Sequence, residues 1–71
     1  EPSALRAQVP GTLVRWLVDD GVEVTRGQPV AALDAMKTEA QVLAHRSGTL
    51  RHGADIGAVV GVDDVLASIE T

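Results

Sequence analysis

Residues Leu33 to Leu43 read LDAMKTEAQVL, and the structure of this stretch decides the fold of the whole chain. Ala, Leu, Met, Lys, Glu and Gln are residues that helices favour. The apolar residues at positions 33, 36, 40 and 43 also follow the spacing of three and four that forms one stripe on a helix. A helix would leave Lys37 on an ordinary solvated surface, whereas a turn would place it at an exposed tip.

The composition limits what the chain can do. Its 71 residues suffice for one small domain that buries about 60% of its unfolded surface. Cysteine is absent, so disulfides and thiolate metal sites are excluded. Six basic and ten acidic residues give a net charge of −4 without a basic cluster, and Trp16 is the only Phe, Trp or Tyr residue. We therefore do not expect a nucleic-acid partner.

No apolar run approaches the roughly 20 residues of a membrane-spanning helix, and the first residues lack the pattern of a signal peptide. We expect a cytoplasmic protein with no membrane partner. Because the chain begins without Met, we also expect residues 1–71 to be a single domain that is excised from, or tethered to, a longer polypeptide.

An internal repeat argues against the helix. The segment Gly11-Thr12-Leu13 recurs as Gly48-Thr49-Leu50, at an offset of 37 residues. At an offset of 36, further matches pair Gly21, Val24, Val30, Leu33 and Asp34 with Gly57, Val60, Leu66, Ile69 and Glu70. One deleted residue between the two blocks reconciles the offsets. The second copy ends in GVDDVLASIE, whose alternation is typical of a strand, so residues 29–34 are predicted to form a strand as well.

Turn signals at short intervals predict an all-β sandwich or barrel. The predicted strands cover residues 5–9, 12–18, 22–24, 29–35, 38–44, 48–52, 58–60 and 64–70. Two similar halves then pack about a pseudo-twofold axis, and Ala35-Met36-Lys37-Thr38 is the hairpin turn that joins them. Lys37 lies at the tip of this turn, where acylation of its amine would remove the positive charge.

The segment Asp34-Ala35-Met36-Lys37 resembles the Glu-Ala-Met-Lys signature of biotin carboxyl carrier domains, in which a biotin protein ligase attaches biotin to the lysine. The resemblance covers nearly the whole chain, because the framing residues Val9–Thr12, Gly21, Val24, Gly27-Gln28, Val30, Ala44, Ser47-Gly48 and Leu66–Glu70 also fall where this family places them. It implies a flattened barrel, or barrel-sandwich hybrid (hammerhead), of two four-stranded antiparallel sheets. It also implies that the extra loop called a thumb is absent.

The same resemblance implies a function. Residues 1–71 would be a biotinyl carrier domain, without catalytic residues or a metal, of a larger biotin-dependent carboxylase. Biotin attached covalently to Lys37 would move between the active sites of a biotin carboxylase and a carboxyltransferase. These two and the biotin protein ligase are the expected partners, and Ala35, Met36 and Thr38 would be the flanking residues that they recognise.

Two residues depart from the family pattern. Asp34 stands where Glu is usual, and because Asp keeps the charge we expect little change in fold. Thr38 stands where a second Met is usual, which removes one flexible apolar contact. We expect the ligase still to recognise the tip, and we expect the carboxylase partners to hold it less well because this contact is missing.

Three alternatives compete with a biotin carrier. A lipoyl domain shares the fold and modifies the same lysine, but it typically surrounds that lysine with acidic residues, whereas Ala35 and Met36 follow the biotin pattern. An unmodified barrel-sandwich domain used for contacts explains the repeat but gives Ala-Met-Lys no purpose. A helical interaction module over residues 30–44 would contradict the repeat.

Other polar and aromatic residues have simpler explanations than a site. His45 and His52 have no further ligands at metal-binding spacing, so no metal site is expected. The pairs Asp19-Asp20 and Asp63-Asp64 fit turns better than a catalytic carboxylate pair. Trp16 is expected in the core or in a partly buried sheet.

Overall fold

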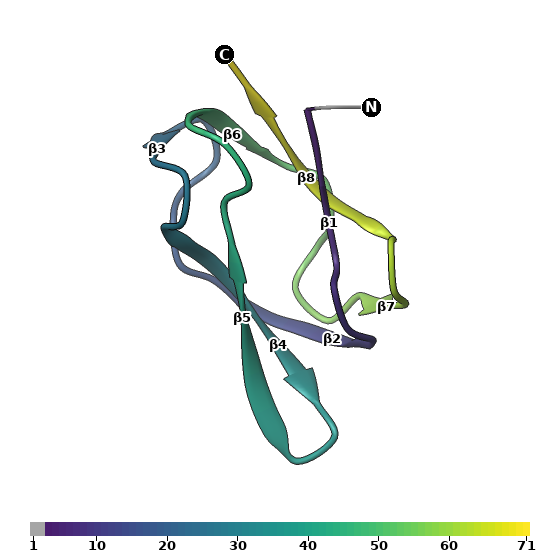
Figure 1. Ribbon diagram of the computed structural model, residues 1–71. Coiled ribbons are helices and arrows are strands. Elements are labelled where there is room, and N and C mark those ends of the chain that lie inside the picture. Colours follow the sequence, from purple (N-terminus) through teal and green to yellow (C-terminus); the bar gives the residue numbers. More distant parts are fainter. Residues whose placement is uncertain (1–2) are drawn as a thin grey trace.

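Every regular element in the computed structural model, which describes residues 3–71, is a strand (Figure 1). In chain order the strands are β1 (Ala4–Arg6), β2 (Gly11–Trp16), β3 (Glu23–Val24), β4 (Pro29–Ala35), β5 (Thr38–Leu43), β6 (Gly48–His52), β7 (Val59–Val60) and β8 (Val65–Glu70). They form two four-stranded antiparallel sheets, with strand orders β1-β8-β6-β3 and β5-β4-β2-β7. The two sheets do not close into one continuous barrel, so the predicted barrel-sandwich hybrid is confirmed.

All eight predicted strands are present. The largest difference between a predicted and an observed boundary is at the end of the first strand. This strand was predicted over residues 5–9, but β1 ends at Arg6. Beyond it, Ala7 still bonds to the turn before β8, since its N–H donates to Asp64 O at 2.9 Å and its oxygen accepts from Asp63 N at 2.8 Å. The chain then bends before Pro10 and enters the other sheet as β2. The connection from β2 to β4 contains only turns and β3, as expected for a domain without a thumb.

The hydrophobic core is built from the internal repeat. Its buried cluster, within residues 3–71, consists of seven pairs that are 36 or 37 positions apart. The pairs are Leu5/Val42, Ala7/Ala44, Leu13/Leu50, Val24/Val60, Val30/Leu66, Ala31/Ala67 and Leu33/Ile69. Because each half contributes the same set of positions, the halves pack about a pseudo-twofold axis and share a single core.

The change of offset from 37 to 36 coincides with a β-bulge in β2. Leu13 pairs with Leu33, but Arg15 pairs with Ala32, so Val14 is the extra residue. A bulge sets two residues of one strand against one of its neighbour. The equivalent pairing of β6 with β8 is uninterrupted. Val14, the bulge residue of the first copy, therefore has no equivalent in the second copy, and this accounts for the change of offset.

Two equivalent glycines allow the strands to approach closely. A Cβ at Gly11 would lie 2.7 Å from the oxygen of Asp34, and one at Gly48 would lie 2.5 Å from the oxygen of Glu70. Both acceptors belong to the backbone, which cannot move aside cheaply. These contacts explain why Gly opens both β2 and β6.

Trp16 and His52 occupy equivalent positions in the two halves and stack on one another. Their ring centroids are 3.9 Å apart, with an angle of 9° between the ring planes. Trp16 Nε1 donates to the oxygen of Ala54 at 3.2 Å, and His52 Nε2 lies 3.0 Å from the oxygen of Val18, the residue equivalent to Ala54. The expected partly buried position of Trp16 is confirmed. The role of His52 in this stack was not predicted.

Candidate functional site

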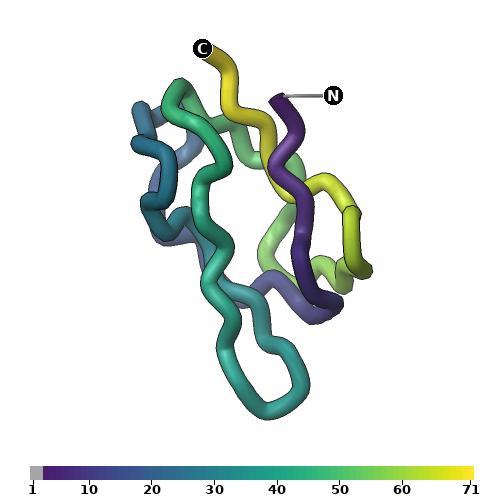
Figure 2. Tube along the Cα trace, in the orientation of Figure 1, coloured from purple at the N-terminus to yellow at the C-terminus, as the bar shows by residue number. Residues whose placement is uncertain are grey.

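The β4–β5 hairpin projects from the body of the domain and carries Lys37 (Figure 1, Figure 2). The pair Ala35↔Thr38 closes the ladder, so Met36 and Lys37 alone form the loop. Their φ angles are 45° and 75°. Positive φ at both loop residues is typical of a type I′ turn, in which Asn and Gly are usual. In other residues this conformation costs roughly 1–2 kcal/mol each, which the adjoining ladder has to offset.

Two side-chain contacts support the hairpin, one at the base of its loop and one between β5 and β2. The Thr38 hydroxyl donates to the oxygen of Ala35 at 3.1 Å, which fastens the base of the loop. Farther down, Arg15 of β2 reaches across β4 to Glu39 of β5, with 2.8 Å between Nη2 and Oε2. The small side chain of Ala32 lies in β4 opposite Arg15, and it is buried. The outer strand β5 is thus linked to β2 by an ion pair as well as through the ladder with β4.

Lys37 presents its amine to solvent. The residue is exposed, and neighbouring Met36 is 92% exposed. The ion pairs within residues 3–71 join Arg15 to Glu39 and Arg51 to Asp20, so neither engages Lys37. It is also the only lysine of the 71 residues. A single primary amine on a two-residue tip is suited to acylation by another enzyme.

The helical alternative for residues 30–44 is wrong, because nearly all of them belong to β4 and β5. The apolar stripe that would define the helix is also broken up. Leu33 is buried in the core, whereas Met36 is at the tip and Leu43 is 49% exposed. Lys37 therefore has the position that the turn prediction gave it, beside Ala35, Met36 and Thr38.

The remaining candidate residues form no second site. In the described part of the chain, no three His, Asp or Glu side chains are grouped so as to hold a metal ion. Asp64 Oδ2 accepts from Gly61 N at 2.7 Å and so closes its own turn, as predicted. Asp20 lies in a turn as well, but its Oδ1 accepts from His52 N at 2.8 Å and links that turn to the end of β6. Between residues 3 and 71 there is no helix with the length and apolar character needed to cross a membrane.

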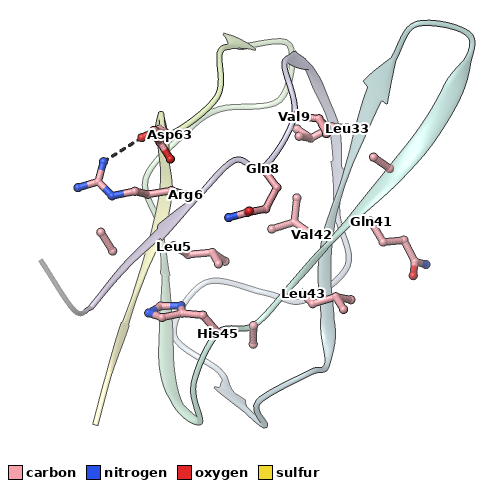
Figure 3. A pocket seen from close by; sticks show the side chains of 13 residues that line it. Leu5, Arg6, Gln8, Val9, Leu33, Gln41, Val42, Leu43, His45 and Asp63 are labelled. Atoms are coloured by element: carbon pink, nitrogen blue, oxygen red, sulfur yellow. Dashed lines mark hydrogen bonds between the residues drawn. The ribbon is translucent and has the colours of Figure 1, made fainter.

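An apolar groove of about 570 Å³ opens between β1 and β5, the edge strands of the two sheets (Figure 3). Leu5, Leu33 and Val42 line it, with Gln8 and His45 at its sides. Lys37 and its loop neighbours are not among the lining residues, so the groove is separate from the tip. No local sequence pattern predicted it, because its two walls come from strands far apart in the sequence.

Comparison with known proteins identifies the family. The family model described as "Biotin-requiring enzyme" matches residues 3–69. The chain belongs to this family. Acetyl-CoA carboxylase of Dictyostelium discoideum is 37% identical over 70 residues, which cover 99% of this chain and 3% of that protein. Membership of the family of biotin-requiring enzymes confirms the resemblance noted from residues 34–37 and their framing segments.

Solved structures agree with this family assignment. The urea carboxylase of Kluyveromyces lactis matches with a TM-score of 0.87 and 29% identity, over 94% of this chain and 6% of that chain. A single-chain, multi-domain long-chain acyl-CoA carboxylase matches with a TM-score of 0.81 and 31% identity, over 96% of this chain and 7% of that chain. The 71 residues thus span only a small part of each relative. They form the biotin carboxyl carrier domain, which carries the cofactor and does not catalyse the reaction.

Proposed function

We propose that Lys37 is the residue that carries covalently attached biotin, and that Ala35, Met36 and Thr38 are its recognition residues. The observation that carries this proposal is the exposed position of Lys37 in a two-residue hairpin loop. Membership of a biotin-requiring family supports biotin as the attached group. The net charge of −4 and the scattered basic residues fit partners that are proteins and not nucleic acids or membranes.

The residues at the tip fit this group. The Lys37 Nζ atom would attack the biotin carboxyl group after a biotin protein ligase has activated it with ATP. The new amide bond forms as the activating group leaves, and the lysine loses a proton and its charge. Attached biotin supplies a ureido nitrogen that accepts a carboxyl group and later gives it up.

The dimensions of the domain indicate how it would work. A lysine–biotin arm of about eleven bonds reaches about 14 Å. The domain itself is 33 Å long, and the start of β1 and the end of β8 lie at the opposite end from the hairpin (Figure 1). An arm of this length serves widely separated active sites only if the whole domain moves on a tether.

We therefore propose that residues 1–71 are a tethered domain of a larger cytoplasmic carboxylase, with biotin carboxylase and carboxyltransferase parts as partners. Loading assays test the proposal. Biotin protein ligase with ATP and biotin should add one biotin per chain, whereas a lipoate ligase with lipoate should add nothing. Loading with lipoate alone would make the chain a lipoyl domain, and no loading by either enzyme would favour an unmodified interaction domain.

Thr38 should matter more for the carboxylase than for the ligase. Its hydroxyl bonds to Ala35 O, but it offers less apolar surface than the Met that is usual in the family. Because Thr38 is exposed, Thr38→Met should leave the rate of ligase loading within about twofold of the wild-type rate. It should change the rate of biotin carboxylation, because a flexible apolar contact is added beside Lys37.

The matched control is Thr38→Val, which has a similar shape but lacks the hydroxyl, so it measures the hydrogen bond alone. Ligase kinetics, carboxylase turnover and thermal melts should be measured on both variants. If Thr38→Met slows the ligase severalfold and leaves carboxylation unchanged, the tip is adapted to its ligase instead.

A further inference from the structure

The chain contains a single sulfur atom, and this atom lies beside Lys37. Cysteine is absent and Met36 is the only methionine, so its thioether is the one sulfur group in the 71 residues. Met36 is 92% exposed, which is more than any other large apolar residue in the described part of the chain. The thioether of an exposed methionine is readily oxidised to a sulfoxide. An oxidant therefore meets one reactive sulfur in this domain, at the tip of the hairpin.

The only other side chain with an easily oxidised ring, Trp16, is covered by its contacts. Trp16 is partly buried against the core, and its ring stacks on that of His52 with 3.9 Å between the centroids. Its Nε1–H donates to the oxygen of Ala54 at 3.2 Å. Because Met36 has no comparable cover, we expect oxidation to be selective for the tip.

The fold does not depend on the side chain of Met36. The pair Ala35↔Thr38 closes the ladder, and the bond from the Thr38 hydroxyl to the oxygen of Ala35 fastens the base of the loop. Met36 lies beyond both contacts, and it does not belong to the seven core pairs. A sulfoxide at position 36 adds a polar oxygen that faces solvent, so it should leave the free energy of unfolding nearly unchanged. Its effect would be confined to the surface that partners recognise.

Met36 is also the only large apolar side chain at the tip. Between residues 34 and 39 the other side chains are charged or polar, or are the single methyl group of Ala35. A partner that holds this loop through an apolar contact therefore has Met36 to bind, and a flexible thioether adapts well to such a contact. A sulfoxide is polar, and its oxygen would lose water on binding without gaining a matching donor. Oxidation thus removes the one large apolar contact that the tip offers.

From these observations, and resting on the proposed function, we propose that Met36 is a site of reversible oxidation that controls the loading of Lys37. The oxidant is a peroxide. A lone pair of Met36 Sδ attacks one oxygen of hydrogen peroxide, the O–O bond breaks, and the second oxygen leaves as water after a proton transfer. Sulfur is oxidised to the sulfoxide and the peroxide is reduced. A methionine sulfoxide reductase reverses the step with two thiols, which become a disulfide while the oxygen leaves as water.

The first test follows the oxidised residue and the loading rate in the same sample. The unloaded chain is used, because biotin contains a thioether of its own. After treatment with hydrogen peroxide, the tryptic peptide of residues 27–37 should gain the mass of one oxygen atom. Loading by biotin protein ligase should fall roughly tenfold, since a polar group is then buried without a partner, and the thermal melt should not change. Methionine sulfoxide reductases for both epimers, with a thiol, should restore the mass and the rate.

Three variants separate the effect of the sulfur from that of its position. Met36→Leu has no sulfur, so peroxide should leave this variant's own loading rate unchanged. Adding Leu33→Met returns one thioether to the chain, but at a core position that is 1% exposed and where the exchange roughly conserves volume. Peroxide should oxidise this buried sulfur far more slowly than that of Met36. Met36→Gln, which is polar without oxidation, should load as slowly as the oxidised wild type.

Loading of a fully oxidised chain at the untreated rate would overturn the proposal. An equal loss in Met36→Leu would do so as well, because peroxide would then act at another residue, and so would a loss accompanied by a lower melting temperature. An untreated wild-type chain that takes up no biotin would instead contradict the proposed function. The peptide map with the reductases would still decide whether Met36 is oxidised reversibly.

Discussion

Substitution of Lys37 by Arg will abolish biotin attachment and, with it, carboxylation by the enzyme that contains this domain. Arginine keeps the positive charge and a long side chain, but its guanidinium does not replace the primary amine in forming the amide. No other lysine exists in the 71 residues to replace Lys37. The fold should not change, because the loop projects into solvent and the core lies in the seven symmetric pairs. Ligase labelling and carboxylase turnover should both fall to background, with an unchanged thermal melt.

A second variant tests whether the position of the amine matters as well as its presence. Met36→Lys in the Lys37→Arg background moves the only lysine by one residue along the same loop. We expect poor labelling, because the amine would stand one residue earlier in the loop, where φ is 45° and not 75°, and the ligase meets a changed tip. Labelling of Lys37→Arg at the wild-type rate would exclude Lys37 as the attachment residue.

Alanine at the two close-approach glycines will destabilise the fold. A Cβ at Gly48 would lie 2.5 Å from Glu70 O and 3.1 Å from Ile69 Cγ2, and one at Gly11 would lie 2.7 Å from Asp34 O. Overpacking of this kind costs roughly 1–3 kcal/mol. Denaturant titration should show this loss for both variants, with the larger loss for Gly48→Ala.

The two glycine variants should differ in function. Gly11 touches the strand residue that leads into the hairpin, whereas Gly48 touches the end of β8, far from Lys37. Only Gly11→Ala should therefore slow ligase loading under conditions in which both variants are folded. Gly61→Ala is the control, because its Cβ would meet nothing nearer than Asp64 Oδ2 at 3.8 Å. Equal stability of all three variants would contradict the close approach of the strands.

Much of the fold could be predicted from the repeat. Matches such as Val30/Leu66 and Leu33/Ile69 revealed that two halves share a structure, and they proved to be core pairs. The repeat was a better guide than the helix-like composition of residues 33–43, because propensity is weak beside the tertiary contacts that bury Leu33 in the core. Leu5/Val42 was missed as a pair, because β1 has only three residues and the two members of the pair are different residues, which leaves little to align.

Other features depend on contacts that no local pattern reveals. Met-Lys is not a usual type I′ loop sequence, so turn chemistry alone would not have predicted a two-residue hairpin. The prediction instead depended on the repeat and on the resemblance of residues 34–37 to a known signature. The Trp16–His52 stack became visible only when equivalent residues of the two halves could be compared in space.

A tryptic peptide map of the chain after loading by biotin protein ligase, ATP and biotin tests the central claim most directly. Trypsin cleaves after Arg26 and Arg46, but it does not cleave after an acylated lysine. Attachment at Lys37 predicts one uncut peptide, residues 27–46, that carries the mass of a single biotinyl group. Recovery of peptides 27–37 and 38–46 without added mass, or of the biotinyl group on any other peptide, would contradict it.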